Sequence, residues 1–317
     1  MPLDPQAELV LGLVKKAGLP ELWQLTADQA REQYQLRVAK LAPKLEVHRT
    51  ADRRIPGPGS ELPVRIYQPR EAKPGELFPV LLWFHGGGFV IGNLDTHDCA
   101  CRMLCTQAEC IVVAVDYRLA PEHKFPAAVE DCLAALRWLA LHGREIGADP
   151  ARIAVGGDSA GGNLGAVCAI LARNEGFPKL AFQLLIYPCT APEPETPSHR
   201  KFAEGYLLTR NTITWFYKQY LRSRSDVNDF RFAPLIADDL SNLPPALVLV
   251  AGYDPLRDEG VDYARRLIEA GNRVTLVNYQ GMIHGFYLMG AAIDAANRAT
   301  EQSAQALREA FSAQPLT

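Results

Sequence analysis

The sequence predicts an α/β fold in which a mostly parallel, doubly wound sheet of about eight strands carries a helical cap. Short, continuously apolar segments, typical of strands buried on both faces, alternate with amphipathic helical segments. Several apolar segments end in glycine-rich or polar residues, and ligands bind such sheets at the carboxyl ends of the strands. With 317 residues, 48% of them hydrophobic, the chain can build a sizeable core.

The first 42 residues are predicted to form two polar-rich helices. Leu9, Leu13 and Val14 recur at helical spacing, and Gly18-Leu19-Pro20 separates the first helix from the second. Because this segment precedes every strand, we expect it to pack on the outside of the fold or over its active face.

Eight segments are predicted as strands because apolar and β-branched residues dominate them. They span 45–55, 62–67, 78–84, 111–115, 153–155, 180–187, 246–251 and 273–279. The turn at 56–59 makes the first two a hairpin. Helices are predicted at 96–108, 127–141, 164–172, 258–270 and 291–311. This alternation of strands and helices favours a parallel sheet.

One long interruption breaks the alternation. No strand is predicted at 188–239, which is much longer than an ordinary connection, and an aromatic-rich helix is expected at 209–221. This insertion could form a lid with the N-terminal helices, or it could simply cover an apolar sheet edge. We therefore divide the chain into its predicted parts. These are N-terminal cap helices (1–44), a first core part (45–189), a cap insertion (190–235) and a second core part (236–317).

Composition excludes several classes of partner. The net charge of −3 gives no basic field, so nucleic acid is not an expected ligand, and no apolar run is long enough for a membrane span. No secretory signal is recognised, and the seven cysteines suit reduced thiols, so a cytoplasmic location is expected. The spacing of Cys99, Cys101 and Cys105 is not a usual zinc pattern; we expect small buried side chains and no metal.

The segment Gly157-x-Ser159-x-Gly161 lies between a short predicted strand and a predicted helix. A tight turn there would strain the serine backbone, and the flanking glycines leave room for that strain. The hydroxyl of Ser159 would then stand exposed above the sheet edge, and the N–H of Ala160 would lie at a helix N-terminus, which favours an oxyanion. An ordinary glycine-rich turn is the alternative interpretation.

A second glycine-rich segment follows the buried strand at 78–84. It reads His85-Gly86-Gly87-Gly88, and glycines without a Cβ let backbone N–H groups approach a ligand. The N–H groups of Gly87 and Gly88, together with that of Ala160, could stabilise an oxyanion. For His85 itself, a buried structural role is expected.

Acyl transfer by a serine needs a base and a carboxylate that orients the base. Ser159, Asp254 and His284 each follow a predicted strand at the same end of the sheet, in the chain order Ser…Asp…His of α/β-hydrolases. Asp258 is the alternative orienting acid. The remaining histidines lack a glycine-flanked strand end; they are His48, His97, His123, His142 and His199.

These segments resemble those of the bacterial hormone-sensitive-lipase-like (family IV) carboxylesterases, from about Leu45 to the last helix. The similar motifs are His85-Gly-Gly-Gly-Phe-Val-Ile-Gly92, Asp116-Tyr-Arg-Leu-Ala-Pro-Glu122, Phe125-Pro-Ala-Ala-Val-Glu-Asp131, Gly157-Asp158-Ser-Ala-Gly161-Gly-Asn163, Asp254-Pro-Leu-Arg-Asp258 and Ile283-His-Gly-Phe286. The resemblance implies the α/β-hydrolase fold, the triad Ser159, Asp254 and His284, and oxyanion donors at Gly87, Gly88 and Ala160.

The resemblance further implies a carboxylesterase that cleaves small-molecule esters with short-to-medium acyl chains, without a cofactor. Three alternatives stay open at this point: a ligand-binding receptor of the same fold, a hydrolase of amides, lactones or carbonates, and a lipase acting on triglyceride. Whether the chain forms a homodimer is also left open.

Overall fold

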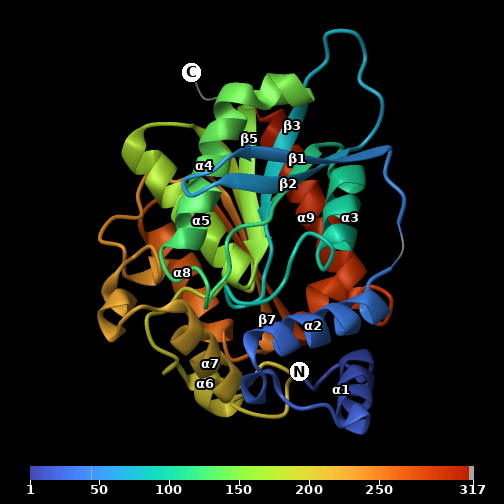
Figure 1. The fold of residues 1–317 in the computed structure, drawn as a ribbon, viewed down its shortest axis with the longest axis vertical. Helices are drawn as coiled ribbons and strands as arrows, with labels where there is room; N and C mark the ends of the chain where they lie inside the picture. Colours follow the sequence, from blue (N-terminus) through green and yellow to red (C-terminus); the bar gives the residue numbers. More distant parts are fainter. Residues whose placement is uncertain (44, 314–317) are drawn as a thin grey trace.

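The computed structural model describes residues 1–43 and 45–313, and it contains one eight-stranded sheet (Figure 1). The strand order is β1-β2-β4-β3-β5-β6-β7-β8, in which β1 and β2 are antiparallel to their neighbours and all the later pairs are parallel. The strands are β1 (Arg49–Pro56), β2 (Glu61–Gln68), β3 (Phe78–Phe84), β4 (Ile111–Val115), β5 (Ala148–Asp158), β6 (Leu180–Ile186), β7 (Ala246–Tyr253) and β8 (Val274–Ile283). The predicted α/β fold class is confirmed.

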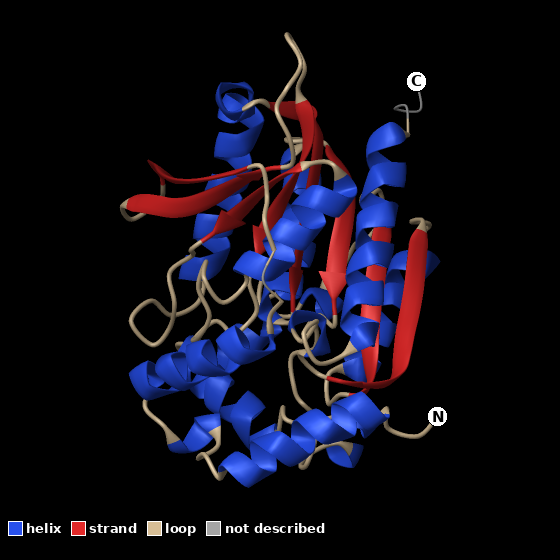
Figure 2. Cartoon of the chain, turned by 90° about the vertical axis from the view of Figure 1, so that its right-hand side faces the viewer, coloured by secondary structure: helices blue, strands red, loops and turns tan. Residues whose placement is uncertain are grey.

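Helices cover both faces of the sheet, and a further group lies beyond the carboxyl ends of the strands (Figures 1 and 2). The helices on the faces are α3 (Asp98–Ala108), α4 (Ala127–His142), α5 (Ala160–Glu175), α8 (Arg257–Glu269) and α9 (Asp294–Ser312). The group at the strand ends comprises α1 (Pro5–Ala17), α2 (Ala27–Leu41), α6 (Pro197–Lys201) and α7 (Arg210–Tyr220).

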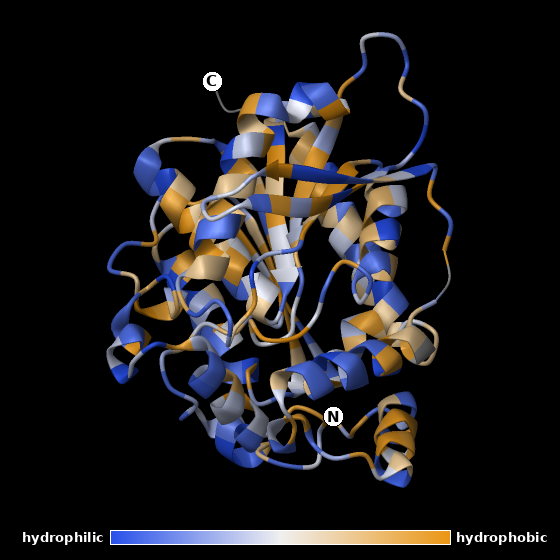
Figure 3. Ribbon diagram, in the orientation of Figure 1, coloured by the Kyte–Doolittle hydropathy of each residue, from blue (hydrophilic) through white to orange (hydrophobic). Residues whose placement is uncertain are grey.

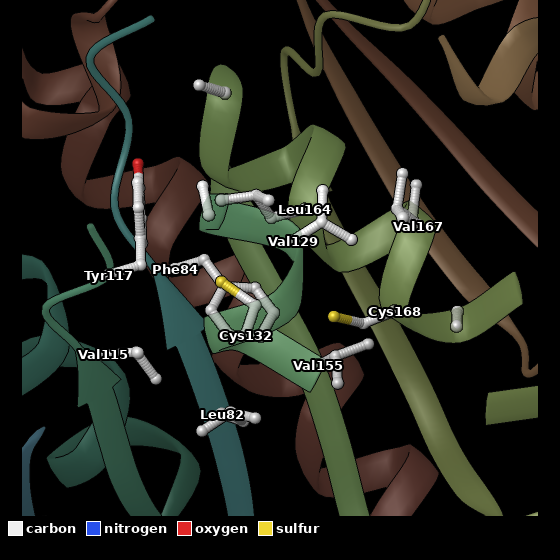
Figure 4. Close-up of a cluster of buried hydrophobic side chains, with 14 of the residues drawn as sticks. Leu82, Phe84, Val115, Tyr117, Val129, Cys132, Val155, Leu164, Val167 and Cys168 are labelled. Carbon is white, nitrogen blue, oxygen red and sulfur yellow. The ribbon is translucent and has the colours of Figure 1, made fainter. Parts of the chain in front are cut away.

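Alternation along the central strands builds two apolar layers. In β3, Leu82 and Phe84 join the cluster beneath α4 and α5, whereas Leu81 and Trp83 join the cluster beneath α3 and α9. All four side chains are fully buried, as expected of a strand covered on both faces. Figure 4 shows the first cluster, where Leu82 and Phe84 lie with residues of β4, β5, α4 and α5.

Local sequence signals account for the helices of the cap. Asp4 caps α1 and Gly18 ends it in a left-handed conformation, which confirms the predicted break between the first two helices. Thr26 and Gln29 form a capping box at the start of α2. The region from 188 to 239 contains short helices and no strand, also as predicted.

Several predicted boundaries were wrong. The first strand begins at Arg49 rather than residue 45, because pairing with β2 starts there. Helix α5 begins at Ala160, directly after the serine, four residues earlier than predicted. The last strand continues to Ile283 because it follows β7 beyond Tyr279. The division into cap and core residues remains a prediction.

Candidate active site

The sheet register brings the predicted site residues together. Phe84 on β3 pairs with Gly157 on β5, so the glycine loop after β3 lies beside the residues around Ser159. On β7 and β8, Tyr253 pairs with Ile283, which makes the next residues, Asp254 and His284, neighbours as well. Strand ends from distant parts of the chain therefore meet at one edge of the sheet.

Ser159 occupies a strained turn between β5 and α5. Its φ of 56° and ψ of −117° lie outside the regions that side-chain-bearing residues prefer. A Cβ at Gly157 or Gly161 would collide with the carbonyl oxygen of Phe84, so glycine is required on both sides of the turn. The Ser159 N–H donates to the Ile186 carbonyl at the end of β6 over 2.8 Å, which fixes the turn to the sheet.

A hydrogen-bonded chain links the serine to a buried carboxylate. His284 Nε2 lies 3.0 Å from Ser159 Oγ, and His284 Nδ1 lies 2.7 Å from Asp254 Oδ2. Asp254 is fully buried, and its other oxygen accepts the Leu256 N–H over 2.8 Å. Because an ionised carboxylate can only accept, Nδ1 carries the proton and Nε2 is left to accept the serine hydroxyl hydrogen.

The alternative acid, Asp258, is not part of this chain. Its carboxylate accepts the Ser198 N–H over 2.8 Å and pairs with Arg257. Asp258 belongs to the first turn of α8, so its side chain points to the cap rather than to His284.

Ser159 itself is only partly buried. It lines a cavity that α2 and α7 also line.

Three backbone N–H groups near Ser159 have no acceptor among the described residues. In the described chain, those of Gly87 and Gly88 donate no hydrogen bond, and Ala160 is the first residue of α5, where the N–H has no partner within the helix. The three amides belong to residues predicted as oxyanion donors. Gly88 and Ser159 line the same cavity.

A second buried network, which the sequence interpretation missed, holds the glycine loop. Asp158 Oδ1 accepts the Gly86 N–H over 2.9 Å and lies 3.1 Å from His97 Nε2. Burial alone would raise the pKa of Asp158, but His97 and the Gly86 N–H bring it below its ordinary value. Burial lowers the pKa of His85 to about 3, so this imidazole is neutral, as its predicted structural role requires. Nothing in the spacing of His97 pointed to Asp158.

The cavity above Ser159 is mainly apolar and lies between the sheet edge and the cap helices. Residues of α2 and of α7 line it, among them Ile213 and Phe216 of α7. Its lining residues are Leu22, Tyr34, Arg37, Val38, Leu41, Gly87, Gly88, Phe89, Ile91, Asp158, Ser159, Cys189, Leu207, Leu208, Thr212, Ile213, Phe216, Tyr217, Leu256, His284, Gly285, Leu288 and Met289.

The described residues contain no cluster of histidine, cysteine or acidic side chains suited to a metal ion. Burial raises the pKa of Cys99 to about 11 and that of Cys105 to about 12, so both stay thiols rather than thiolate ligands. None of the helices in the described ranges is long and apolar enough to cross a membrane.

A parallel sheet with serine, histidine and aspartate hydrogen-bonded at its carboxyl edge defines a hydrolase of the α/β class. The family model described as alpha/beta hydrolase fold matches residues 81–288, and the chain belongs to this family.

Characterised relatives narrow the class. Carboxylic ester hydrolase LipN of Mycobacterium tuberculosis is 46% identical over 292 residues, which cover 90% of this chain and 77% of LipN. Ethyl acetate hydrolase of Pseudomonas putida is 41% identical over 98% of this chain and 99% of its own. An ester hydrolase from the metagenome of Lake Arreo, solved with a bipyridine phosphonate derivative, superimposes with a TM-score of 0.95 at 43% identity, covering 98% of this chain and all of that one.

These similarities make the protein a carboxylic ester hydrolase of the hormone-sensitive-lipase-like type. The resemblance predicted from the sequence motifs is confirmed.

Proposed function

We propose that the protein hydrolyses small-molecule esters through a covalent acyl-enzyme on Ser159. The observation that carries the proposal is the continuous hydrogen-bonded chain from Ser159 Oγ through His284 to the buried Asp254, with distances of 3.0 and 2.7 Å. This geometry lets His284 remove the serine proton while Asp254 stabilises the imidazolium that forms.

In the first half-reaction, Ser159 Oγ attacks the ester carbonyl carbon and its proton passes to His284 Nε2. The carbonyl oxygen becomes an oxyanion, which accepts hydrogen bonds from the N–H groups of Gly87, Gly88 and Ala160. The tetrahedral intermediate then collapses, the carbon–oxygen bond to the alcohol breaks, and His284 returns the proton to the leaving alcohol. Ser159 is left acylated.

In the second half-reaction, water replaces the alcohol. His284 takes a proton from the water, the hydroxide oxygen attacks the acyl carbon, and the same amides receive the new oxyanion. Collapse releases the carboxylic acid, and His284 returns the proton to Ser159 Oγ.

We further propose short-to-medium acyl chains as the substrates. The cavity that contains Ser159 is lined by residues of α2 and α7 and mainly by apolar side chains, which suits a small apolar acyl group. The name of the Pseudomonas putida relative, ethyl acetate hydrolase, supports a preference for short esters.

Replacement of the serine tests the proposal directly. We expect Ser159→Ala to lower kcat for p-nitrophenyl acetate by about 10⁶, as loss of the nucleophile does in a comparable triad. A fluorophosphonate should label the wild type and not the variant, with the adduct located by peptide mass spectrometry. Activity of the variant within tenfold of the wild type, or labelling at another residue, would contradict the assignment.

A further inference from the structure

One side chain in the apolar cavity carries a permanent positive charge. Arg37 on α2 lines the same cavity as Ser159 and His284. The cavity also touches Asp158, but that carboxylate is only 2% exposed and is already occupied by the Gly86 N–H and by His97. The positive charge of Arg37 is therefore not neutralised from within the cavity.

Within the described ranges, Arg37 forms no hydrogen bond and no ion pair. Its guanidinium carbon lies 5.3 Å from the ring centre of Tyr34, one turn earlier on α2. The other partly buried arginines all bind a carboxylate or carbonyl oxygen. They are Arg31, Arg65, Arg70, Arg102, Arg118, Arg152, Arg173, Arg231, Arg257 and Arg266. Among the partly buried arginines of the described ranges, Arg37 therefore differs because its guanidinium binds no carboxylate or carbonyl oxygen.

The pKa of the Arg37 guanidinium is also shifted in a different direction from that of the paired arginines. Burial lowers the pKa of the Arg37 guanidinium, and only the nearby Tyr34 opposes that effect. For Arg65 and Arg118, by contrast, a hydrogen-bonded carboxylate raises the pKa. Arginine nevertheless stays protonated in proteins, so this partly buried charge has no carboxylate partner among the described residues. A ligand carboxylate would supply two charge-assisted hydrogen bonds there.

We propose that Arg37 binds a carboxylate on the substrate, so that the preferred substrates are esters that also carry an anionic group. The inference rests on the proposed function of Ser159 in the same cavity. Two kinds of ester share this chemistry: half esters of dicarboxylic acids, with the charge on the acyl half, and acylated hydroxy acids, with the charge on the alcohol half.

A contact at the end of α2 holds the helix that carries Arg37 in place. The Leu41 carbonyl at the end of α2 accepts the Ala291 N–H over 3.1 Å, and Leu41 shares the cavity with Leu288 and Met289. The helix that carries Arg37 is thereby held against the segment that follows His284. Arg37 is consequently a specificity residue of the cap, separate from the groups that cleave the bond.

Two matched ester pairs test the proposal. Monoethyl succinate is compared with ethyl 4-methylpentanoate, and 3-acetoxypropanoate with isopentyl acetate, so that each anion has a neutral ester of similar shape. Values of kcat/KM follow from acid release in a pH-stat. We expect Arg37→Gln to lower kcat/KM for the anionic ester about 10–100-fold in at least one pair, because a bidentate charged contact is lost. Its effect on the neutral ester should stay below about threefold.

Two further variants control for charge and shape. Arg37→Lys keeps the charge without the planar fork and should fall between the wild type and Arg37→Gln. Arg54→Gln removes an exposed charge on β1, outside the cavity, and should leave the anionic-to-neutral ratio unchanged.

The possible results separate the two proposals. Unchanged ratios in both pairs for Arg37→Gln, with hydrolysis of the neutral esters retained, would overturn the role of Arg37 alone. A wild-type protein that cleaves none of the four esters would overturn the proposed function and this inference with it.

Discussion

Two histidine–carboxylate pairs lie next to Ser159, and they differ in what the second ring nitrogen meets. His284 lies 2.7 Å from Asp254, and its other nitrogen faces the serine hydroxyl. His97 lies 3.1 Å from Asp158, but its other nitrogen meets Thr96 Oγ1 at 2.9 Å. The side chain of His284 is 12% exposed, whereas that of His97 is 1% exposed.

The difference shows that a buried histidine–carboxylate pair does not by itself make a proton-transfer site. His284 Nε2 instead meets Ser159 Oγ at the cavity, and in the proposed mechanism it moves a proton between Ser159 and a ligand. Every polar atom of the His97 ring is used inside the protein, and Asp158 additionally holds the Gly86 N–H. In the proposed mechanism, the first pair transfers protons and the second holds the glycine loop in position.

The largest expected effect separates the two histidines. His284→Gln should lower kcat for p-nitrophenyl acetate by about 10⁶, because the base of a triad is lost, and His97→Gln by about 10–100, because one loop contact is lost. Initial rates, with thermal unfolding as the check on folding, would measure both. Equal losses in two folded variants would contradict the division of roles.

The sequence predicted the features of the site that a short stretch of residues records, and it did not predict contacts that depend on how distant segments pack. Ser159, Asp254 and His284 each come shortly after a predicted strand, so a local pattern identified them, and the parallel topology predicted that they meet. The contact of His97 with Asp158 depends on how the start of α3 packs under the glycine loop, and no periodicity records that packing.

The cap was harder to predict for a similar reason. The break at Gly18-Leu19-Pro20 separated two predicted helices, but it did not show which face of the second helix turns to the cavity. Arg37 and Tyr34 line the cavity because α2 docks at the sheet edge, where the Leu41 carbonyl meets the Ala291 N–H. Docking of this kind is set by long-range packing and leaves no signal within a short stretch of sequence.

A change at Asp158 should have an intermediate effect. Asp158→Asn weakens the hold on Gly86, so the amides of Gly87 and Gly88 should be less well placed. We expect kcat to fall about 10–100-fold, less than the loss of a whole oxyanion donor can cost, with KM within about threefold. Michaelis parameters for a neutral ester would measure this. A rise in KM at unchanged kcat would contradict the positioning role.

The same variant has a defined pH dependence. Because the folded-state pKa of Asp158 is lowered, its contribution to stability is present above the unfolded value of about 3.9 and is lost as the pH falls through the folded value. The difference in unfolding free energy between the wild type and Asp158→Asn should therefore be largest above about pH 4 and shrink in more acidic buffer. Urea unfolding at several pH values would measure it, and a difference that grows in acid would contradict the assignment.

A third histidine–carboxylate pair differs from His97 and Asp158, because the pKa of its carboxyl group is raised and not lowered. His199 on α6 and Glu259 on α8 are both fully buried, and Glu259 Oε2 lies 3.3 Å from His199 Nε2. Burial raises the pKa of Glu259 to about 8, although the Thr190 and Ala191 N–H groups that bind its other oxygen oppose this. Burial also lowers the pKa of His199 to about 4. At neutral pH both partners are therefore uncharged, and a protonated carboxyl can donate to the imidazole.

The smallest effect on activity is expected at Glu259, together with a clear effect on stability. Since the folded-state pKa is raised, this group stabilises the fold fully below the unfolded value of about 4.3, and that contribution is lost as the pH rises towards 8. Glu259→Gln keeps the accepting oxygen and a donor towards His199 but cannot ionise. Relative to the wild type, it should gain stability between pH 5 and pH 8, on the order of a few kcal/mol, with kcat within about twofold. Glu269→Gln, an exposed change on the same helix, serves as the control and should show no such gain. If Glu259→Gln instead lost stability equally at both pH values, the pair would be an ion pair in the folded protein, and the contrast with His97 and Asp158 would disappear.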